Sequence, residues 1–246
     1  MRVRAMAMLL CVVAIGGCTA VDEPGQQTSD APASRISSIS VATQPTSPQL
    51  GGRPTTRVGE SSRALLHSLT VKGRAPKTGY GRSKFGRAWD DNVSIAGGHN
   101  GCDTRDDILR RDLVAVVLRS GTCKVERGTL HDRYTGKIID FVRGERTSNQ
   151  VQIDHVVALA DAWQKGAQQW TSGKRLEFAN DPANLQAVDG AANRQKSAGD
   201  AATWLPPNKS YRCTYISRQI AVKATYGVWV TPAERDAMSR VLDSCD

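Results

Sequence analysis

The sequence predicts an α+β domain built from short antiparallel strands and several helices. Residues 123–142 alternate short β-prone pieces with turn signals such as residues 134–137 (YTGK), which is typical of hairpins. Residues 151–196 contain two short β-prone segments, and a helical pattern follows the second. We therefore expect a strand, a strand and a helix in that order within residues 151–196.

The flanking elements follow from local patterns. Residues 103–118 begin with helical spacing and continue with a β-branched run, so a helix should pass into a strand at a boundary that the pattern does not fix. Residues 151–157 predict a strand, and helical spacing resumes over residues 158–169. Residues 184–188 predict the next strand.

Helix starts are also visible later in the chain. Asp189 is suited to N-cap a helix that runs through Lys196. Residues 215–224 have helical spacing, and Thr231-Pro232 predicts a further helix start, because proline is favoured at the first helical position. The C-terminal part should therefore be helical.

The N-terminus predicts export. Residues 1–17 combine a basic opening with an apolar run that is short for a membrane span, as in a signal peptide. The run ends in Ile15-Gly16-Gly17-Cys18, which resembles a bacterial lipobox and makes Cys18 a candidate lipidation site. An ordinary secretory signal followed by a chance cysteine is the alternative. We expect either a lipid anchor that faces outside the cytoplasm or a secreted protein.

A change in composition divides the remaining chain. Residues 18–74 are rich in Ser, Thr, Pro, Gln and Gly, and we expect a disordered, lipid-anchored tether there, with a short local helix around residues 61–69. Residues 75–246 are long enough for one folded domain. We find no internal repeat and expect a monomer.

The cysteines agree with export. Cys102, Cys123, Cys213 and Cys245 remain once Cys11 and Cys18 are set aside, and four cysteines allow three disulfide connectivities. We predict the pairs Cys102–Cys123 and Cys213–Cys245, because the two cysteines of each pair lie at the two ends of one local loop of the chain. A zinc site is disfavoured, because no Cys-x-x-Cys spacing occurs.

The charge is compatible with a polyanionic partner. The formal net charge is +9, and removal of Arg2 and Arg4 with the signal leaves +7. Nucleic acid would be attracted to such a chain, as would anionic lipid or cell-wall polymer. Charge alone therefore does not select among these partners.

Three short segments carry polar residues in a fixed order: Asp154-His155, Asn184-Leu185 and Asn193-x-x-Lys196. With their surroundings, residues 152–159 (QIDHVVAL), 180–188 (NDPANLQAV) and 193–196 (NRQK), they resemble the HNH endonucleases of the DUF1524 type, which include the C-terminal nuclease domain of GmrSD restriction enzymes. Residues 101–107 (GCDTRDD), 128–130 (GTL) and 134–136 (YTG) resemble the secreted actinobacterial branch of that family.

This resemblance covers most of residues 75–246 and does not reach the tether. It implies a ββα-metal core, also called the HNH or His-Me finger fold, and endonuclease activity. Asn184 resembles the family's middle asparagine, which orients the catalytic histidine. The chain departs from the family's His-Asn-His pattern, because Asp154 and Asn193 stand where many members have metal-binding histidines.

Physical chemistry supports roles for the same residues. His155 is a candidate general base, because imidazole accepts a proton near neutral pH. Asp154 and Asn193 offer hard oxygen ligands that suit Mg²⁺ or Mn²⁺. Lys196, three residues from Asn193 on a helix, is a candidate phosphate contact. Asp154 and His155 are adjacent, so both can serve one site only at a strand end or bulge.

Structural alternatives exist for each residue. His155 lies beside two valines and would by itself be an ordinary structural histidine; Asp154 could cap or form an ion pair, and Asn184 could stabilise a turn. Asn193 and Lys196 could face solvent. The metal ligand near Asn193 could also be Asp189 or Asp200. Three upstream residues match the family's upstream motif: Asp103, Arg105 and Asp106. Ion pairs at the start of a helix explain them as well as a catalytic role does.

The combined observations predict a metal-dependent endonuclease that acts outside the cytoplasm on DNA, with RNA left open, and with little sequence preference. The first alternative is a non-catalytic envelope lipoprotein that binds DNA or wall polymer, but a binding protein has no need for a general base. The second is a zinc hydrolase of wall substrates, for which a nitrogen-rich motif such as His-x-x-x-His is missing from the sequence.

Overall fold

The structure, a computed structural model, describes residues 54–144 and 147–245. The expected signal peptide, the lipidation site Cys18 and the tether up to residue 53 lie outside the described residues. In the described part, none of the helices has the length and the apolar character needed to cross a membrane.

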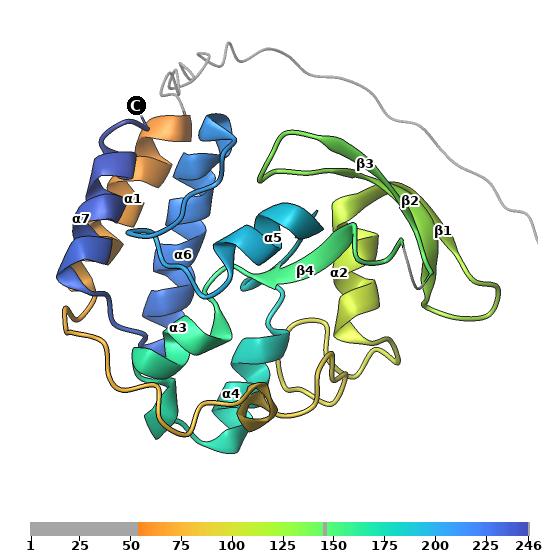
Figure 1. The fold of residues 1–246 in the computed structure, drawn as a ribbon, viewed down its shortest axis with the longest axis horizontal. Coiled ribbons are helices and arrows are strands. Elements are labelled where there is room, and N and C mark those ends of the chain that lie inside the picture. Colours follow the sequence, from red (N-terminus) through yellow and green to blue (C-terminus); the bar gives the residue numbers. More distant parts are fainter. Residues whose placement is uncertain (1–53, 145–146, 246) are drawn as a thin grey trace, which may run out of the picture. The chain divides into compact units, whose positions relative to one another are not determined.

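Two small antiparallel sheets form the β-structure. One has three strands in the order β1 (Leu113–Leu118), β2 (Val125–His131) and β3 (Ile138–Val142). The other pairs β4 (Val151–His155) with β5 (Leu185–Asp189), and His155 lies opposite Leu185. Short antiparallel strands combined with helices confirm the predicted α+β class (Figure 1).

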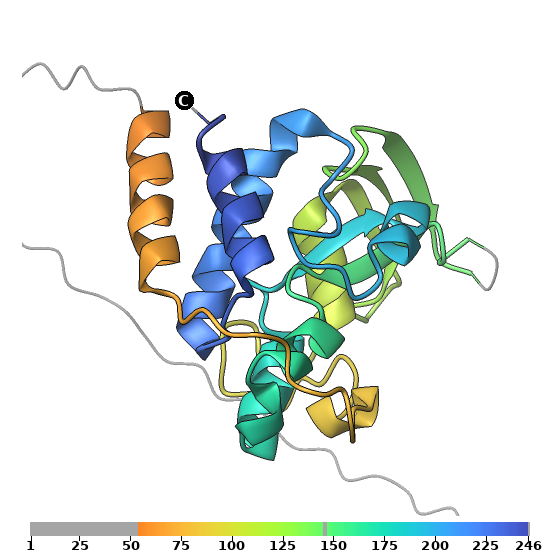
Figure 2. The same ribbon diagram turned by 60° about the vertical axis from the view of Figure 1, so that its left-hand side comes forward.

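Seven α-helices occur among the described residues: α1 (Pro54–Ser68), α2 (Thr104–Asp112), α3 (Leu159–Gln164), α4 (Ser172–Asn180), α5 (Gly190–Lys196), α6 (Arg212–Tyr226) and α7 (Pro232–Leu242). Short 3₁₀ turns lie at η1 (Arg82–Phe85), η2 (Ala167–Gln169) and η3 (Lys209–Tyr211). Figure 2 shows α1, α6 and α7 side by side, away from the three-stranded sheet.

Strand β4, strand β5 and helix α5 follow one another in the order that the sequence predicted. The segment between the two strands carries α3, η2 and α4. The helical pattern expected over residues 158–169 is interrupted after α3, where Gly166 has a φ of 127°, a conformation that favours glycine. The two strands and α5 lie at the centre of the described region in Figure 1.

Capping residues set several helix boundaries. Asp103 accepts a hydrogen bond from the Asp106 amide at 2.8 Å and begins α2. Asp189 accepts one from the Ala192 amide at 2.8 Å and begins α5, as predicted. Thr231 forms a capping box at the start of α7, and Pro232 occupies the first turn. These boundaries depend on contacts within one turn.

Helix α1 occupies sequence that we expected to belong to the tether. It runs from Pro54 to Ser68, and Leu66 and Leu69 are buried in the core that α6 and α7 form. Residues 54–74 therefore contribute to the fold. The apolar residues there are too few to shift the average composition, but Leu66 and Leu69 pack against a distant part of the chain.

The expected disulfides are present. Cys102 pairs with Cys123, with Cα atoms 5.5 Å apart, and links the start of α2 to the turn between β1 and β2. Cys213 pairs with Cys245, with Cα atoms 5.7 Å apart, and links α6 to the C-terminal end. The two pairs are those predicted.

A cluster of charges, buried except for Arg74 at its edge, joins the helical elements. Its members are Arg74, Asp161, Lys165, Asp200, Lys223 and Glu234. The ammonium of Lys165 lies 2.6 Å from Asp161, 2.8 Å from Asp200 and 2.6 Å from Glu234. Three positive and three negative groups balance one another, which is the condition under which charges are tolerated in a protein interior.

The packing of α1 gives a stability prediction. Leu66 is 4% exposed, whereas its neighbour Leu65 is 36% exposed. We expect Leu66→Ala to lower the free energy of unfolding by about 2–5 kcal/mol, because the substitution leaves a cavity in the core, and Leu65→Ala to change it by less than about 0.5 kcal/mol. Urea unfolding of both variants measures this, and equal effects would show that α1 is not docked.

Candidate active site

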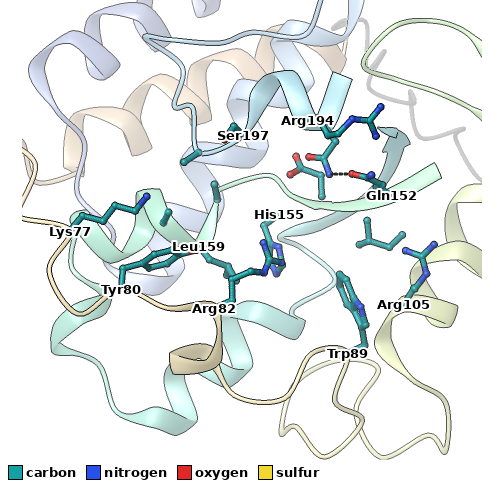
Figure 3. Close-up of a pocket in the computed structure, with 16 residues that line it drawn as sticks. Lys77, Tyr80, Arg82, Trp89, Arg105, Gln152, His155, Leu159, Arg194 and Ser197 are labelled. Carbon is teal, nitrogen blue, oxygen red and sulfur yellow. Dashed lines mark hydrogen bonds between the residues drawn. The ribbon is translucent and has the colours of Figure 1, made fainter. Parts of the chain in front are cut away.

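A pocket of about 580 Å³ lies over the end of β4 and the side of α5. Asp154, His155 and Asn193, which the sequence selected, all line this pocket. Figure 3 shows His155 near the middle of the lining residues, between Arg82 and Trp89. The fold thus brings together residues that are up to 39 positions apart in the sequence.

His155 is the last residue of β4, so the strand-end position required by its neighbour Asp154 is met. The imidazole Nε2 lies 2.8 Å from the carbonyl oxygen of Ala179 in α4. Because a carbonyl oxygen only accepts hydrogen bonds, Nε2 carries the proton and Nδ1 keeps its lone pair. The Trp89 ring stacks on the imidazole, with 6.0 Å between centroids and 14° between planes.

Burial keeps this imidazole neutral. It lowers the pKa of His155 to about 3, and the positive charges of Arg82 and Lys196 act in the same direction, although the hydrogen bond to Ala179 opposes them. At neutral pH the ring therefore has a free nitrogen lone pair. The lone pair can accept a proton, but a pKa of about 3 makes the imidazole a weaker base than an ordinary histidine.

Asp154 turns away from the imidazole and contacts a different set of groups. Its carboxylate accepts a 2.6 Å hydrogen bond from the Tyr134 hydroxyl and lies 2.9 Å from the Lys196 ammonium. Burial and the nearby Asp154 raise the pKa of Tyr134 well above its ordinary value, so the phenol stays protonated and donates. Asp154 thus lines the pocket, but its carboxylate already contacts Tyr134 and Lys196, neither of which lines the pocket.

Lys196 is buried. Its ammonium group, which is 0% exposed, donates to Asp154 and to the carbonyl oxygen of His155 at 2.8 Å. It is not among the residues that line the pocket. The structure therefore places Lys196 as a link between α5 and the end of β4, and its predicted contact with phosphate stays a prediction.

Asn184 is fully buried next to the segment that follows His155. Its side-chain oxygen accepts from the Val157 amide at 2.8 Å, and its side-chain nitrogen donates to the Phe178 carbonyl oxygen at 3.3 Å. It does not touch the imidazole in these contacts. Asn184 instead connects the backbone after β4 to α4, which carries the carbonyl that holds His155.

Asn193 lies on α5 at the pocket wall. Its side-chain nitrogen donates to the Gln152 side-chain oxygen at 3.0 Å, as Figure 3 shows. No hydrogen bond to its side-chain oxygen is found among the described residues. Asp189 and Asp200, the alternatives, do not line the pocket: Asp189 caps α5, and Asp200 belongs to the buried charge cluster.

Two oxygen donors at the pocket are of the type that binds a hard divalent cation. Asp154 offers a carboxylate and Asn193 an amide oxygen, and Mg²⁺ sites in proteins often use one or two such ligands and several waters. The ion pair between Asp154 and Lys196 reduces the negative charge available to such an ion. In the described part of the chain, no group of three His, Cys, Asp or Glu side chains has the arrangement of a metal site.

Four cations also line the pocket: Lys77, Arg82, Arg105 and Arg194. Asp154 is the one acidic residue among the lining residues that the structure describes, and Lys196 balances its charge. The pocket is therefore positively charged, which suits an anionic ligand. Of these four cations, the sequence pattern singles out only Arg105, without a defined role.

One sequence signal points to two of these cations. Residues 61–89 contain seven Lys or Arg residues and no Asp or Glu. This acid-free segment passes the site, where Lys77 and Arg82 reach the pocket (Figure 3). The upstream acidic residues have structural contacts instead, because Asp103 caps α2 and Asp106 is buried against Arg143. Of that upstream motif, Arg105 is the residue that reaches the pocket.

Comparison with known proteins identifies the family of the chain. The family described as "GmrSD restriction endonucleases, C-terminal domain" matches residues 103–241. An "Uncharacterized secreted protein" of Arthroderma benhamiae is 37% identical over 187 residues, which cover 75% of this chain and 85% of that protein. No solved structure matches the chain significantly. The family match spans more than half of the chain, so the protein belongs to this GmrSD C-terminal domain family.

The buried neutral imidazole predicts a pH-dependent stability. In the unfolded chain histidine has a pKa of about 6.5, whereas burial lowers that of folded His155 to about 3. Between these values the unfolded state binds the proton, so the free energy of unfolding falls as the pH drops below about 6.5, by at most about 1.4 kcal/mol per pH unit. We expect His155→Gln to remove this component.

Urea unfolding with EDTA at several pH values between 7 and 4.5 measures the effect. His131→Gln, which changes an exposed histidine, is the matched control. The pH dependence should be shallower for His155→Gln than for the wild type and for the control. Identical slopes for all three proteins would show that His155 is not held neutral by the fold.

Proposed function

We propose that this protein is a metal-dependent endonuclease of the HNH type that hydrolyses DNA outside the cytoplasm, with RNA as a further substrate left open. The observation that carries the proposal is the His155 imidazole, whose Nδ1 has no hydrogen-bond partner among the described residues and which lies in a positively charged pocket beside two oxygen donors. The family's description as restriction endonucleases supports the same class of reaction.

The strand–strand–helix order of β4, β5 and α5 supports a ββα-metal core. In this proposal His155 is the general base. Its Nδ1 takes a proton from a water molecule while the water oxygen attacks phosphorus, and the bond from phosphorus to the leaving oxygen breaks. That oxygen takes up a proton from solvent water and His155 later releases its own to solvent, so the products are one phosphate end and one hydroxyl end.

Asp154 and Asn193 are the proposed metal ligands, with water and a phosphate oxygen completing the coordination. A bound Mg²⁺ or Mn²⁺ would supply Lewis-acid stabilisation of the charge that develops on the phosphoryl oxygens. The amide oxygen of Asn193 faces no competing donor among the described residues. Gln152 fixes the orientation of this amide by accepting from its nitrogen.

The phosphate contacts are assigned to the cations that line the pocket. Arg82 lies next to His155 (Figure 3), and a guanidinium there would bind the phosphate under attack. Lys77, Arg105 and Arg194 would bind neighbouring phosphates of the strand. Lys196 would have to leave a buried ion pair to do so, and we propose instead that it positions Asp154 and the backbone of His155.

Asn184 is a positioning residue in this scheme. It holds the backbone after His155 against α4, and α4 supplies the Ala179 carbonyl that fixes the imidazole. A catalytic histidine needs such support, because only one tautomer leaves Nδ1 free to accept the proton.

An extracytoplasmic location is supported by two observations. The two disulfides are typical of oxidising compartments. The relative from Arthroderma benhamiae is named a secreted protein. We propose that this chain is also exported, either held to the membrane by lipidation at Cys18 or released as a secreted protein.

Cleavage of plasmid DNA tests the proposed function. The oxidised protein should cut the plasmid with Mg²⁺ or Mn²⁺ and give a smear instead of discrete fragments, because base-specific contacts are not expected. His155→Ala should lower the rate by about 10²–10⁴-fold, the usual contribution of a general base. EDTA should abolish cleavage.

His131→Ala, in which an exposed histidine is removed, is the control and should keep full activity. Cleavage that persists in His155→Ala or in EDTA would exclude this mechanism. A folded wild-type protein that binds DNA without cutting it under any metal condition would favour the alternative, a non-catalytic envelope lipoprotein.

The role of Arg82 has a separate test in binding. Each phosphate contact contributes about one unit to the slope of log affinity against log salt concentration. We expect Arg82→Ala to weaken DNA binding and to reduce this slope by about one, whereas Arg235→Ala, on α7 and outside the pocket, should leave the slope unchanged. Fluorescence anisotropy with EDTA measures both; equal slopes for Arg82→Ala and the wild type would remove Arg82 from the phosphate contacts.

A further inference from the structure

A second hollow, of about 230 Å³, lies beside the proposed active site. Arg82, Trp89, His155 and Leu159 line both spaces, so the two hollows share a wall that contains the proposed general base. The remaining lining comes mainly from residues 83–88 and from the end of α4. This hollow is not used by the hydrolytic scheme.

The chemistry of the second hollow differs from that of the first. Its lining includes the aromatic residues Phe85 and Trp89, together with Leu159, Ala88 and Ala179. The charged groups that line it are two guanidiniums, Arg82 and Arg87, and the imidazole of His155 is uncharged at neutral pH. Among the described residues, no carboxylate lines it. Such a lining suits a flat, largely apolar group that is attached to an anion.

The wall between the hollows is held in place. Trp89 has a φ of 59°, which is unusual for a large side chain and persists only where surrounding contacts fix it. The next residue supplies these contacts: the Asp90 amide donates to Asn180 at 3.0 Å, and its carbonyl accepts from the Thr104 hydroxyl at 3.1 Å. The Trp89 ring is thus positioned before any ligand arrives.

We propose that this hollow binds one nucleobase of the substrate, next to the phosphate under attack; the inference rests on the proposed nuclease function. A base is joined to its phosphate by a single sugar. Two hollows with a common wall can therefore hold the phosphate in one and the base in the other. The volume is smaller than the roughly 300–1,000 Å³ of drug-sized ligand sites and suits one ring system. Aromatic rings and guanidinium planes are the surfaces on which unpaired bases stack.

A preference for single strands follows. A base in a duplex is paired and stacked, so it must leave the stack before it can enter a pocket, whereas a base in a single strand is already available. The protein should therefore cleave and bind single-stranded DNA better than a duplex of the same sequence. The preference should not depend on base identity, because every base has an aromatic face.

The test compares two variants that add the same ring. Ala88→Phe fills the hollow from an exposed position, and Ser94→Phe places a phenyl group on an exposed residue that lines neither hollow. The substrates are a thymidine 20-mer, its duplex with the complementary adenosine 20-mer, and a single strand of the same length that lacks all bases. Thermal unfolding establishes that both variants are folded.

We expect the wild type to favour the single strand over the duplex in kcat/KM. Ala88→Phe should lose about five- to one-hundred-fold on the single strand, the range that corresponds to one stacked base, while Ser94→Phe should not. With EDTA present, the wild type should bind the base-free strand more weakly than the thymidine 20-mer in fluorescence anisotropy. This binding measurement uses the unaltered protein and does not depend on catalysis.

The outcomes separate the two proposals. Cleavage without strand preference, with equal rates for Ala88→Phe and Ser94→Phe, would overturn the base site and leave the nuclease intact. Absence of any cleavage would overturn the nuclease, and the anisotropy comparison would still decide on the base site. Equal affinities for the thymidine and the base-free strand would show that no base is bound.

Discussion

The ion pair between Lys196 and Asp154 is the contact on which the arrangement of the site depends. A fully buried ammonium joins the end of α5 to the carboxylate of Asp154 and to the backbone carbonyl of the next residue, His155. The Tyr134 hydroxyl, from the turn between β2 and β3, donates to the same carboxylate. A buried charge must keep its partners, so strand β4 and helix α5 are held in one relative position. Asn193, on α5, therefore faces the strand end that carries the imidazole.

The other components of the site come from segments that this central unit does not contain. Helix α4, which lies between β4 and β5 in the sequence, supplies the Ala179 carbonyl that selects the tautomer of His155. The acid-free segment before residue 90 supplies Arg82 and the stacking ring of Trp89. The site thus has two parts: a histidine positioned by local strand structure, and a charged and aromatic wall positioned by packing. In the proposed reaction the histidine acts on the nucleophile, and the wall binds the substrate.

Much of the fold could be predicted because its signals are local. Asp189 caps α5 and Thr231 begins α7 through contacts within one helical turn, and the two disulfides bracket single excursions of the chain. Helix α1 could not be placed by composition, because its stabilising partners, α6 and α7, lie more than 140 residues away. The family resemblance selected Asp154, His155 and Asn193, and the structure places all three at one pocket. The sequence pattern gave no indication that Lys77, Arg82 and Arg194 line the pocket.

The sequence by itself determined the class of fold and the disulfide pairs, and its family resemblance selected candidate residues for hydrolytic chemistry, because residue types and their order along the chain can be read without knowing what surrounds each side chain. Tertiary structure alone decided which groups those residues meet. It placed Lys196 inside an ion pair instead of on the pocket surface, gave Asp189 and Asp200 partners elsewhere, and brought Arg82 and Trp89 against His155. The physical reason is that burial and electrostatic pairing are properties of the space around a side chain, and residues far apart in the chain fill that space.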